Sequence, residues 1–188
     1  MLAQIGNLLI ETIFGFFVFL LLLRFYMQVF RAPFRSPIGE FVTTLTNWIV
    51  RPTRRVIPGL FGLDTASLLL AWLMQALMLF LLTAIRGMPA ASGGWILVIF
   101  LAAALDLVRY SIYLLIGVVL LQVILSWVSP YNMMSGMLDS LTRPFYRIFR
   151  RFIPPIGAID LSPLFVLLAA QILLILLNGL TRSILGAV

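Results

Sequence analysis

The stretch RRVIPGLFGLD at residues 54–64 has a counterpart, RRFIPPIGAID, at residues 150–160. The aspartates that close the two stretches are 96 residues apart, and so are the arginine pairs that open them. Self-similarity at a fixed offset is the signature of an internal repeat. Because each copy lies between two apolar segments, the sequence predicts two units, each built as span, basic connection and span.

The composition places most of this surface in lipid. Of the 188 residues, 63% are hydrophobic and 10% are charged, and the mean hydropathy is +1.15. A soluble domain has roughly 45–50% apolar and about 25% charged residues. The apolar surplus exceeds what a core of this size buries, and the hydrocarbon of a bilayer is the solvent that accommodates it.

Four apolar segments have the length of about 20 residues that one bilayer crossing needs. They cover residues 8–30, 66–84, 108–128 and 163–180. We expect residues 95–105, which lead into the third segment, to be interfacial, re-entrant or the projecting end of a tilted helix. A full crossing there would put the second basic connection outside, against the positive-inside rule.

The repeat also predicts the topology. Residues 1–88 and 95–188 form the two repeats, and two crossings in each make the repeats parallel. Both basic connections then face one side, which the positive-inside rule makes cytoplasmic, with both termini outside. We therefore predict an all-α protein of the inner (plasma) membrane with four transmembrane helices.

Each basic connection has the pattern of an amphipathic helix lying in the cytoplasmic interface. Apolar residues recur at helical spacing over residues 38–49, opposite polar ones. A second apolar stripe covers residues 145–152, and Thr142 and Pro144 are typical of a helix start. The aromatic side chains are expected to point into the acyl chains.

Arginines in these connections are candidate ligands for anionic lipid head groups or a protein partner. Clustered juxtamembrane arginine is typical of topology and of binding to anionic lipid, and the planar guanidinium bonds two phosphate oxygens at once. The chain uses arginine and no lysine, and this exclusive use of arginine is explained equally well by a functional need for guanidinium groups or by the base composition of the genome. Nucleic-acid binding is disfavoured, since no soluble domain is left to carry it. The candidates are Arg51, Arg54, Arg55, Arg143, Arg147, Arg150 and Arg151.

The repeated phrase has a structural interpretation as well, in which it forms a corner between an interfacial helix and a span. Proline ends the interfacial helix because it lacks an N–H, and the aspartate caps the span that follows. The arginine pairs are near enough in sequence to reach these aspartates. The corner residues are Pro58 and Asp64, then Pro154, Asp160, Ser162 and Pro163.

Amide side chains inside the spans are most simply explained as interhelix hydrogen bonds. Gln75 and Gln171 obey the 96-residue offset, so a pseudo-symmetric fold would place them on facing spans; Gln122 and Asn178 complete the set. The alternative interpretation is a lining for a permeating ion or solute.

Charged residues in the spans are expected near membrane interfaces. Glu11 is placed near the outer interface, and Arg24 toward the cytoplasmic end of its span, where long cationic side chains snorkel. Asp106 and Arg109 stand three residues apart, a spacing at which they can pair on one helix face near the interface.

The chain contains neither cysteine nor histidine. Disulfides, thiol nucleophiles, Cys/His zinc sites and imidazole general bases are therefore excluded. We predict no enzymatic activity, no cofactor and no metal site.

The sequence resembles the YggT family of small integral membrane proteins of bacteria, with relatives in plastids. The resemblance lies in SPIGEFVTTLTNWIVRPTRRVIP at residues 36–58 and LTRPFYRIFRRFIPPIGAIDLSP at residues 141–163. The family tends to have two prolines around the arginine stretch, of which the first repeat keeps Pro52 and the second keeps Pro144.

The resemblance implies roles in osmotic-stress tolerance, ion homeostasis, and cell division or membrane organisation, without a known enzymatic activity. In plastids it implies cytochrome b6 haem maturation and nucleoid distribution, although this chain has no histidine or cysteine to hold iron. Our main hypothesis is a membrane-organising protein that docks anionic lipid, a membrane-protein partner or a second copy. The alternative is an ion channel or transporter component.

Overall fold

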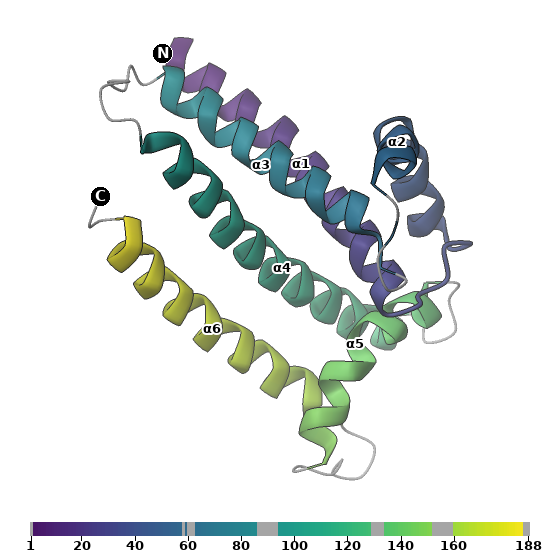
Figure 1. The fold of residues 1–188 in the computed structure, drawn as a ribbon. Helices are drawn as coiled ribbons and strands as arrows, with labels where there is room; N and C mark the ends of the chain where they lie inside the picture. The colour runs from purple at the N-terminus through teal and green to yellow at the C-terminus, as the bar shows by residue number, and fades with distance from the viewer. Residues whose placement is uncertain are drawn as a thin grey trace.

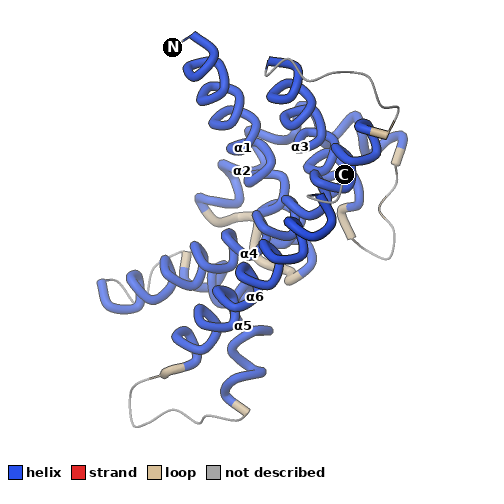
Figure 2. The backbone as a smooth tube through the Cα atoms, turned by 90° about the vertical axis from the view of Figure 1, so that its left-hand side faces the viewer, coloured by secondary structure: helices blue, strands red, loops and turns tan. Residues whose placement is uncertain are grey.

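The computed structural model describes residues 2–57, 59, 63–85, 94–128, 134–151 and 160–185. The side chains of residues 2, 3, 184 and 185 are outside this description. Within the described residues the chain is built from helices and short connections (Figure 2). The helices are α1 (Leu2–Val29), α2 (Pro37–Val56), α3 (Thr65–Ile85), α4 (Trp95–Val128), α5 (Ser135–Arg150) and α6 (Ser162–Leu185).

Four of these helices, α1, α3, α4 and α6, are long and apolar enough to cross a membrane. They lie beside one another, while α2 and α5 lie apart from each other toward the end of the bundle opposite both termini (Figure 1). Along the described chain, the order of an apolar helix, a shorter and less apolar helix and a second apolar helix therefore occurs twice, although α2 with 20 residues is only one residue shorter than α3. The long helix α4 has 34 residues and a length of about 51 Å, so residues 95–105 continue the third span as one helix.

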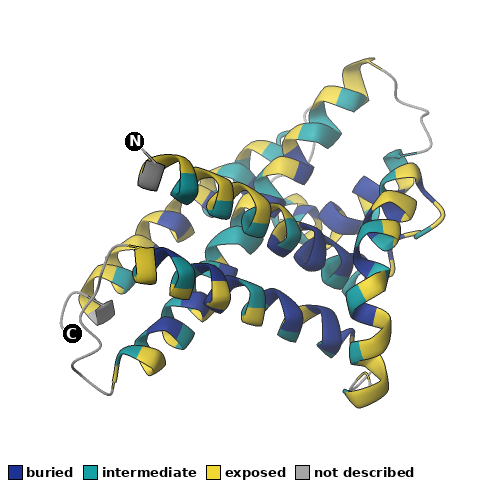
Figure 3. Cartoon of the chain, turned by 90° about the horizontal axis from the view of Figure 1, so that it is seen from above, coloured by how far each residue is buried: buried dark blue, intermediate teal, exposed yellow. Residues whose placement is uncertain are grey.

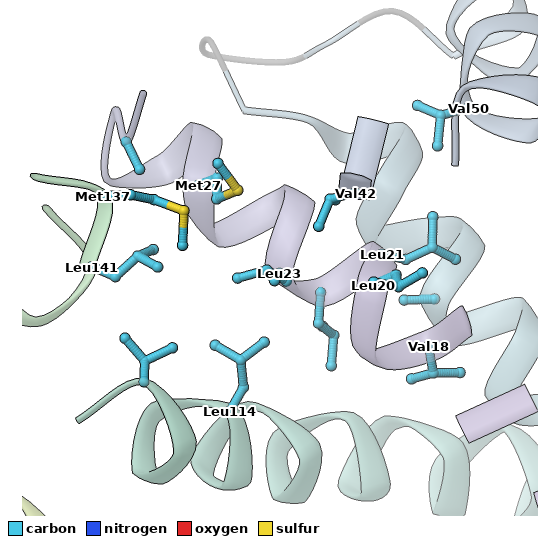
Figure 4. Close-up of a cluster of buried hydrophobic side chains, with 14 of the residues drawn as sticks. Val18, Leu20, Leu21, Leu23, Met27, Val42, Val50, Leu114, Met137 and Leu141 are labelled. Carbon is cyan, nitrogen blue, oxygen red and sulfur yellow. The ribbon is translucent and has the colours of Figure 1, made fainter. Parts of the chain in front are cut away.

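The main hydrophobic core surrounds the second half of α1. Leu21, Leu22 and Met27 of this helix are almost completely buried, and Val42 of α2 and Met137 of α5 close the cluster (Figure 4). Buried positions lie where helices meet, whereas the outward faces of the long helices are exposed and apolar (Figure 3). Such large exposed apolar faces are what lipid contact requires.

Local chemistry explains where α2 begins. Ser36 is its N-cap and accepts a hydrogen bond from the backbone N–H of Gly39 at 3.1 Å, and Pro37 occupies the first helical position. A Cβ on Gly39 would lie 2.5 Å from the carbonyl oxygen of Phe34, so only glycine fits this turn.

The predicted start of the second short helix is wrong. Thr142 and Pro144 lie inside α5, which begins at Ser135. Pro144 is exposed, so the carbonyl that loses its helical partner there faces outward and can be solvated. Thr142 is fully buried and serves a different purpose, described below.

Candidate functional site

The first basic corner joins α2 to α3 through Asp64. Arg54 near the end of α2 donates from its Nε and Nη2 atoms to the two carboxylate oxygens, at 3.1 and 2.5 Å. The same carboxylate accepts from the backbone N–H of Ser67 at 3.3 Å and from its hydroxyl at 2.6 Å. Asp64 therefore caps α3 and holds α2 against it, as its place before the span predicts.

The second basic corner repeats this bond between α5 and α6. Arg150 donates from Nε and Nη2 to the Oδ2 atom of Asp160, at 3.0 and 2.5 Å. Asp160 also accepts from the backbone N–H of Ser162 at 2.8 Å, and Pro163 lies in the first turn of α6. The expectation that the arginine pairs reach these aspartates is confirmed for Arg54 and Arg150.

The two corners differ in burial because Arg24 takes part only in the first. Its guanidinium donates to the hydroxyl of Thr46 at 2.7 Å and to the Oδ1 atom of Asn47 at 2.9 Å, and its Nε lies 3.5 Å from Asp64. Arg24 is 5% exposed, so the expectation that it snorkels is wrong. Because α2 supplies oxygen acceptors, the cation is stable where it is buried.

A buried threonine fixes each short helix to the span before it. Thr46 of α2 binds Arg24 of α1, whereas Thr142 of α5 donates to the Oε1 atom of Gln122 of α4 at 2.5 Å. These threonines are 96 residues apart, but their partners are chemically different. The contact confirms the interhelix bond predicted for Gln122, whereas no pattern in the sequence predicts Arg24 as the partner of Thr46.

The electrostatics of both corners favour the charged carboxylate. Burial acts to raise the pKa of Asp64, but the hydrogen bonds from Arg54 and Ser67 outweigh it and leave this pKa below its ordinary value. For Asp160, burial opposes the bonds from Ser162 and Arg150, and the pKa is again lowered. Both carboxylates are therefore ionised at neutral pH.

Other arginines of the basic connections point away from the protein. Arg51 and Arg55 on α2 are exposed, as are Arg143 and Arg147 on α5 and Arg151 directly after it. Among the described residues these five have no acidic partner, and we call them the exposed arginine set. The predicted corner prolines, Pro58 and Pro154, lie outside the described residues.

A polar cluster joins three of the long helices. Gln75 of α3 donates to the Oδ2 atom of Asp106 on α4 at 3.0 Å. Arg109 pairs with the Oδ1 atom of Asp106 at 2.5 Å and donates to Asn178 of α6 at 3.3 Å. The pairing of Asp106 with Arg109 is confirmed, and so are the interhelix bonds of Gln75 and Asn178.

The position of this cluster differs from the expectation. Gln75 lies about 15 Å along α3 from Thr65, which is the middle of that helix. Its bond places Asp106 level with this midpoint and away from the ends of the span. Two buried atoms of the cluster, the Oε1 of Gln75 and the Nε of Arg109, have no hydrogen-bond partner in the described part of the chain.

The expected facing pair of glutamines is not formed. Gln75 is fully buried, but Gln171 is exposed, and the described residues offer it no hydrogen-bond partner. In the part of the chain that the structure describes, helices α3 and α6 share no contact. The physical reason is that α3 packs between α1 and α4, whereas α6 packs on α4 and α5 and leaves one face uncovered.

The arrangement contains groups that can bind a ligand and orient one helix against another. Its polar side chains are arginine, aspartate, amides and the hydroxyls of serine and threonine, and no group of three potential metal ligands occurs in the described residues. The fold and its exposed apolar helix faces define the class of an α-helical protein suited to crossing a membrane several times.

The chain belongs to the CCB3/YggT family, whose model matches residues 3–85 and 101–181. It is 31% identical over 175 residues to an uncharacterized protein of Pseudomonas aeruginosa, covering 92% of this chain and 88% of the relative. The uncharacterized protein YggT of Escherichia coli K12 is 32% identical over 169 residues, covering 88% of this chain and 85% of the relative. No solved structure matches the chain.

Proposed function

We propose that the chain is a non-enzymatic membrane protein that organises anionic lipid or partner proteins through the exposed arginine set. The supporting observation is that α2 and α5 lie toward one end of the bundle (Figure 1), and that the exposed arginine set belongs to these helices and to the residue directly after α5. Arg54 and Arg150 are occupied by their aspartates. The docking surface is therefore smaller than the sequence alone predicts.

The proposal includes a topology. The long helices cross the inner membrane as two parallel repeats, and α2 and α5 are amphipathic helices in the cytoplasmic interface, with both termini outside. Support comes from the family model, which matches one segment in each half, and from the exposed Phe41 and Trp48 of α2, since aromatics favour the interface.

Topology can be mapped with single cysteines, because the native sequence has none. We expect cysteines at positions 34 and 135 to react with an impermeant reagent from the cytoplasmic side, and those at 91 and 186 from the other. Labelling of 34 and 135 from opposite sides would overturn the parallel arrangement.

The docking function is tested by lipid enrichment around the reconstituted protein. Energy transfer from the labelled chain to head-labelled phosphatidylglycerol, diluted in phosphatidylcholine, should exceed that to labelled phosphatidylcholine and fall at high salt. Changing all five residues of the exposed arginine set to Gln should abolish the difference. The matched control is the double variant Arg54→Gln and Arg150→Gln, which should retain it. Unchanged enrichment in the five-residue variant would refute the proposal.

The second candidate function is an ion channel or transporter component acting in osmotic or ion homeostasis. Its favouring observation is the polar cluster of Gln75, Asp106, Arg109 and Asn178, which lies between apolar helices, where ionisable groups are costly. Ion flux into proteoliposomes should then exceed flux into empty vesicles and fall in the Asp106→Asn variant. Flux equal to that of empty vesicles would eliminate this candidate.

A further inference from the structure

An apolar groove of about 780 Å³ separates the two halves of the bundle. Its walls come from α1, α3 and α4, and α5 and α6 also contribute side chains. Trp72 and Ala104 lie at the end nearest the polar cluster, and Phe30 and Ile57 lie at the end nearest the basic corners. Ligand sites have volumes of roughly 300–1,000 Å³ and mainly apolar walls.

The extent of the groove matches one leaflet of a bilayer. On α3 its lining runs from Thr65, the first residue of the helix, to Trp72, about one turn before Gln75. On α4 it runs from Ala104, two residues before Asp106, to Val118, about 21 Å of helix. The groove therefore extends from the polar cluster toward the corners over a length comparable with half of a hydrocarbon core, which is about 15 Å deep. A transmembrane helix is about 10 Å wide and 30 Å long, twice the depth of one leaflet, whereas a single acyl chain is narrow and about one leaflet long. An acyl chain is the membrane component that fits.

A cation is held at the corner end of the groove in an unusual conformation. Arg31 directly follows Phe30, is exposed, and has a φ of 53°. It ends α1 in a Schellman motif, with its N–H bonded to the carbonyl of Gln28 at 3.2 Å and that of Ala32 to Met27 at 2.8 Å.

Glycine is the usual residue at this position because a Cβ is disfavoured at positive φ. Strain that a chain retains at one residue suggests a function for its side chain. Here the side chain is an exposed guanidinium on the residue that follows Phe30 of the groove lining, and a guanidinium is suited to a phosphate.

We propose that the groove binds one acyl chain of an anionic phospholipid, with Arg31 contacting its phosphate. The lipid belongs to the leaflet on the side of α2 and α5, and its tail lies between the two halves. The inference rests on the proposed function only in placing the chain across a membrane with its corners at the cytoplasmic leaflet. It does not depend on the exposed arginine set.

Trp72 provides a direct probe of the bound tail. A chain that keeps Trp72 and carries Phe at positions 48, 95 and 127 reports on the groove alone, since Trp72 is the one tryptophan in its lining. It is reconstituted in phosphatidylcholine containing a small fraction of lipid with brominated acyl chains. We expect several-fold stronger and saturable quenching by brominated phosphatidylglycerol than by brominated phosphatidylcholine.

Two variants on α4 separate the groove from general lipid contact. Ala104→Phe places a ring in the groove and should remove the saturable quenching. Gly117→Phe is the matched control, because Gly117 is exposed, lies outside the groove lining, and has open space at its Cβ. Equal quenching in both variants would overturn the proposal. It would also be overturned if neither brominated lipid quenched Trp72 in the parent chain, which is the result expected when a second copy of the protein covers the groove.

Arg31 is tested in the same assay. Arg31→Gln should remove the preference for phosphatidylglycerol, while Arg35→Gln, an exposed arginine of the same connection, should keep it. Arg31→Gly relieves the backbone strain, so it should lose the preference without any fall in thermal midpoint. A preference that survives both Arg31 changes would overturn the assignment. Selective quenching that persists in the five-residue Gln variant would support the groove even if surface docking fails.

Discussion

At the scale of single residues, Asp64 connects three helices. It caps α3, accepts two hydrogen bonds from Arg54 of α2 and lies 3.5 Å from the Nε of Arg24 on α1. Asp160 bonds to Arg150 in the same way, but the Asp160 side chain is 29% exposed, compared with 1% for Asp64. Solvent screens the second pair, so the two bonds contribute differently to stability.

Neutralising these aspartates should therefore have unequal effects. We expect Asp64→Asn to cost roughly 3–5 kcal/mol, because it leaves the buried Arg24 without a counter-charge, and Asp160→Asn to cost about 0–1 kcal/mol. Adding Arg24→Leu to Asp64→Asn should recover part of the loss, since the uncompensated charge is removed. Unfolding in detergent measures all three. Equal losses for the two aspartates would contradict this account.

The same carboxylates predict how stability depends on pH. Their pKa values are lowered by folding, so their contribution is complete above the unfolded value of about 3.9 and is lost as pH falls through the folded value. The thermal midpoint of the native chain should thus fall as pH decreases below about 4. In Asp64→Asn the fall should be smaller, and the two curves should converge at low pH; parallel curves would exclude Asp64 as the cause.

At the scale of elements, the turn before α2 depends on a close backbone approach at Gly39. Gly39→Ala should destabilise the protein by roughly 1–3 kcal/mol, because its Cβ would meet the backbone of Phe34 and force a shift. Gly136→Ala in the first turn of α5 is the matched control, since nothing lies within 4 Å of that Cβ. The Gly136→Ala variant should be more stable than the native chain by up to about 1 kcal/mol, because alanine has a higher helix propensity than glycine. A destabilising Gly136→Ala would contradict this reading of the two helix starts.

The elements themselves could be predicted because apolar length and helix-cap chemistry are local signals. The four long helices and the cap at Asp64 follow from such signals. The start of α5 could not be placed in this way. A proline such as Pro144 is tolerated inside a helix when the carbonyl four residues before it, which loses its N–H donor, faces outward. The burial of Arg24 could not be predicted from local signals either, since its acceptors Thr46 and Asn47 belong to a different helix.

At the scale of the whole molecule, the sequence offset predicts corresponding residues but not corresponding surroundings. Arg54 with Asp64 and Arg150 with Asp160 form the same bond. Gln75 and Gln171 have the same offset, yet only Gln75 is buried, because α3 has neighbours on two sides and α6 does not. Contacts within one unit are thus predictable from the repeat, whereas contacts between the halves require the assembled fold.

The glutamine pair tests this distinction. Gln75→Leu should destabilise the protein by roughly 0.5–2 kcal/mol, because Asp106 loses one of its donors and α3 loses a polar bond to α4. Gln171→Leu, at the corresponding position of the second unit, should change stability by less than about 0.5 kcal/mol, since that side chain already faces outward. Thermal unfolding of the two variants in the same detergent provides the comparison. If Gln171→Leu were the more damaging change, α6 would have to pack against a surface other than the one in this structure, and the polar cluster would not be what holds the two halves together.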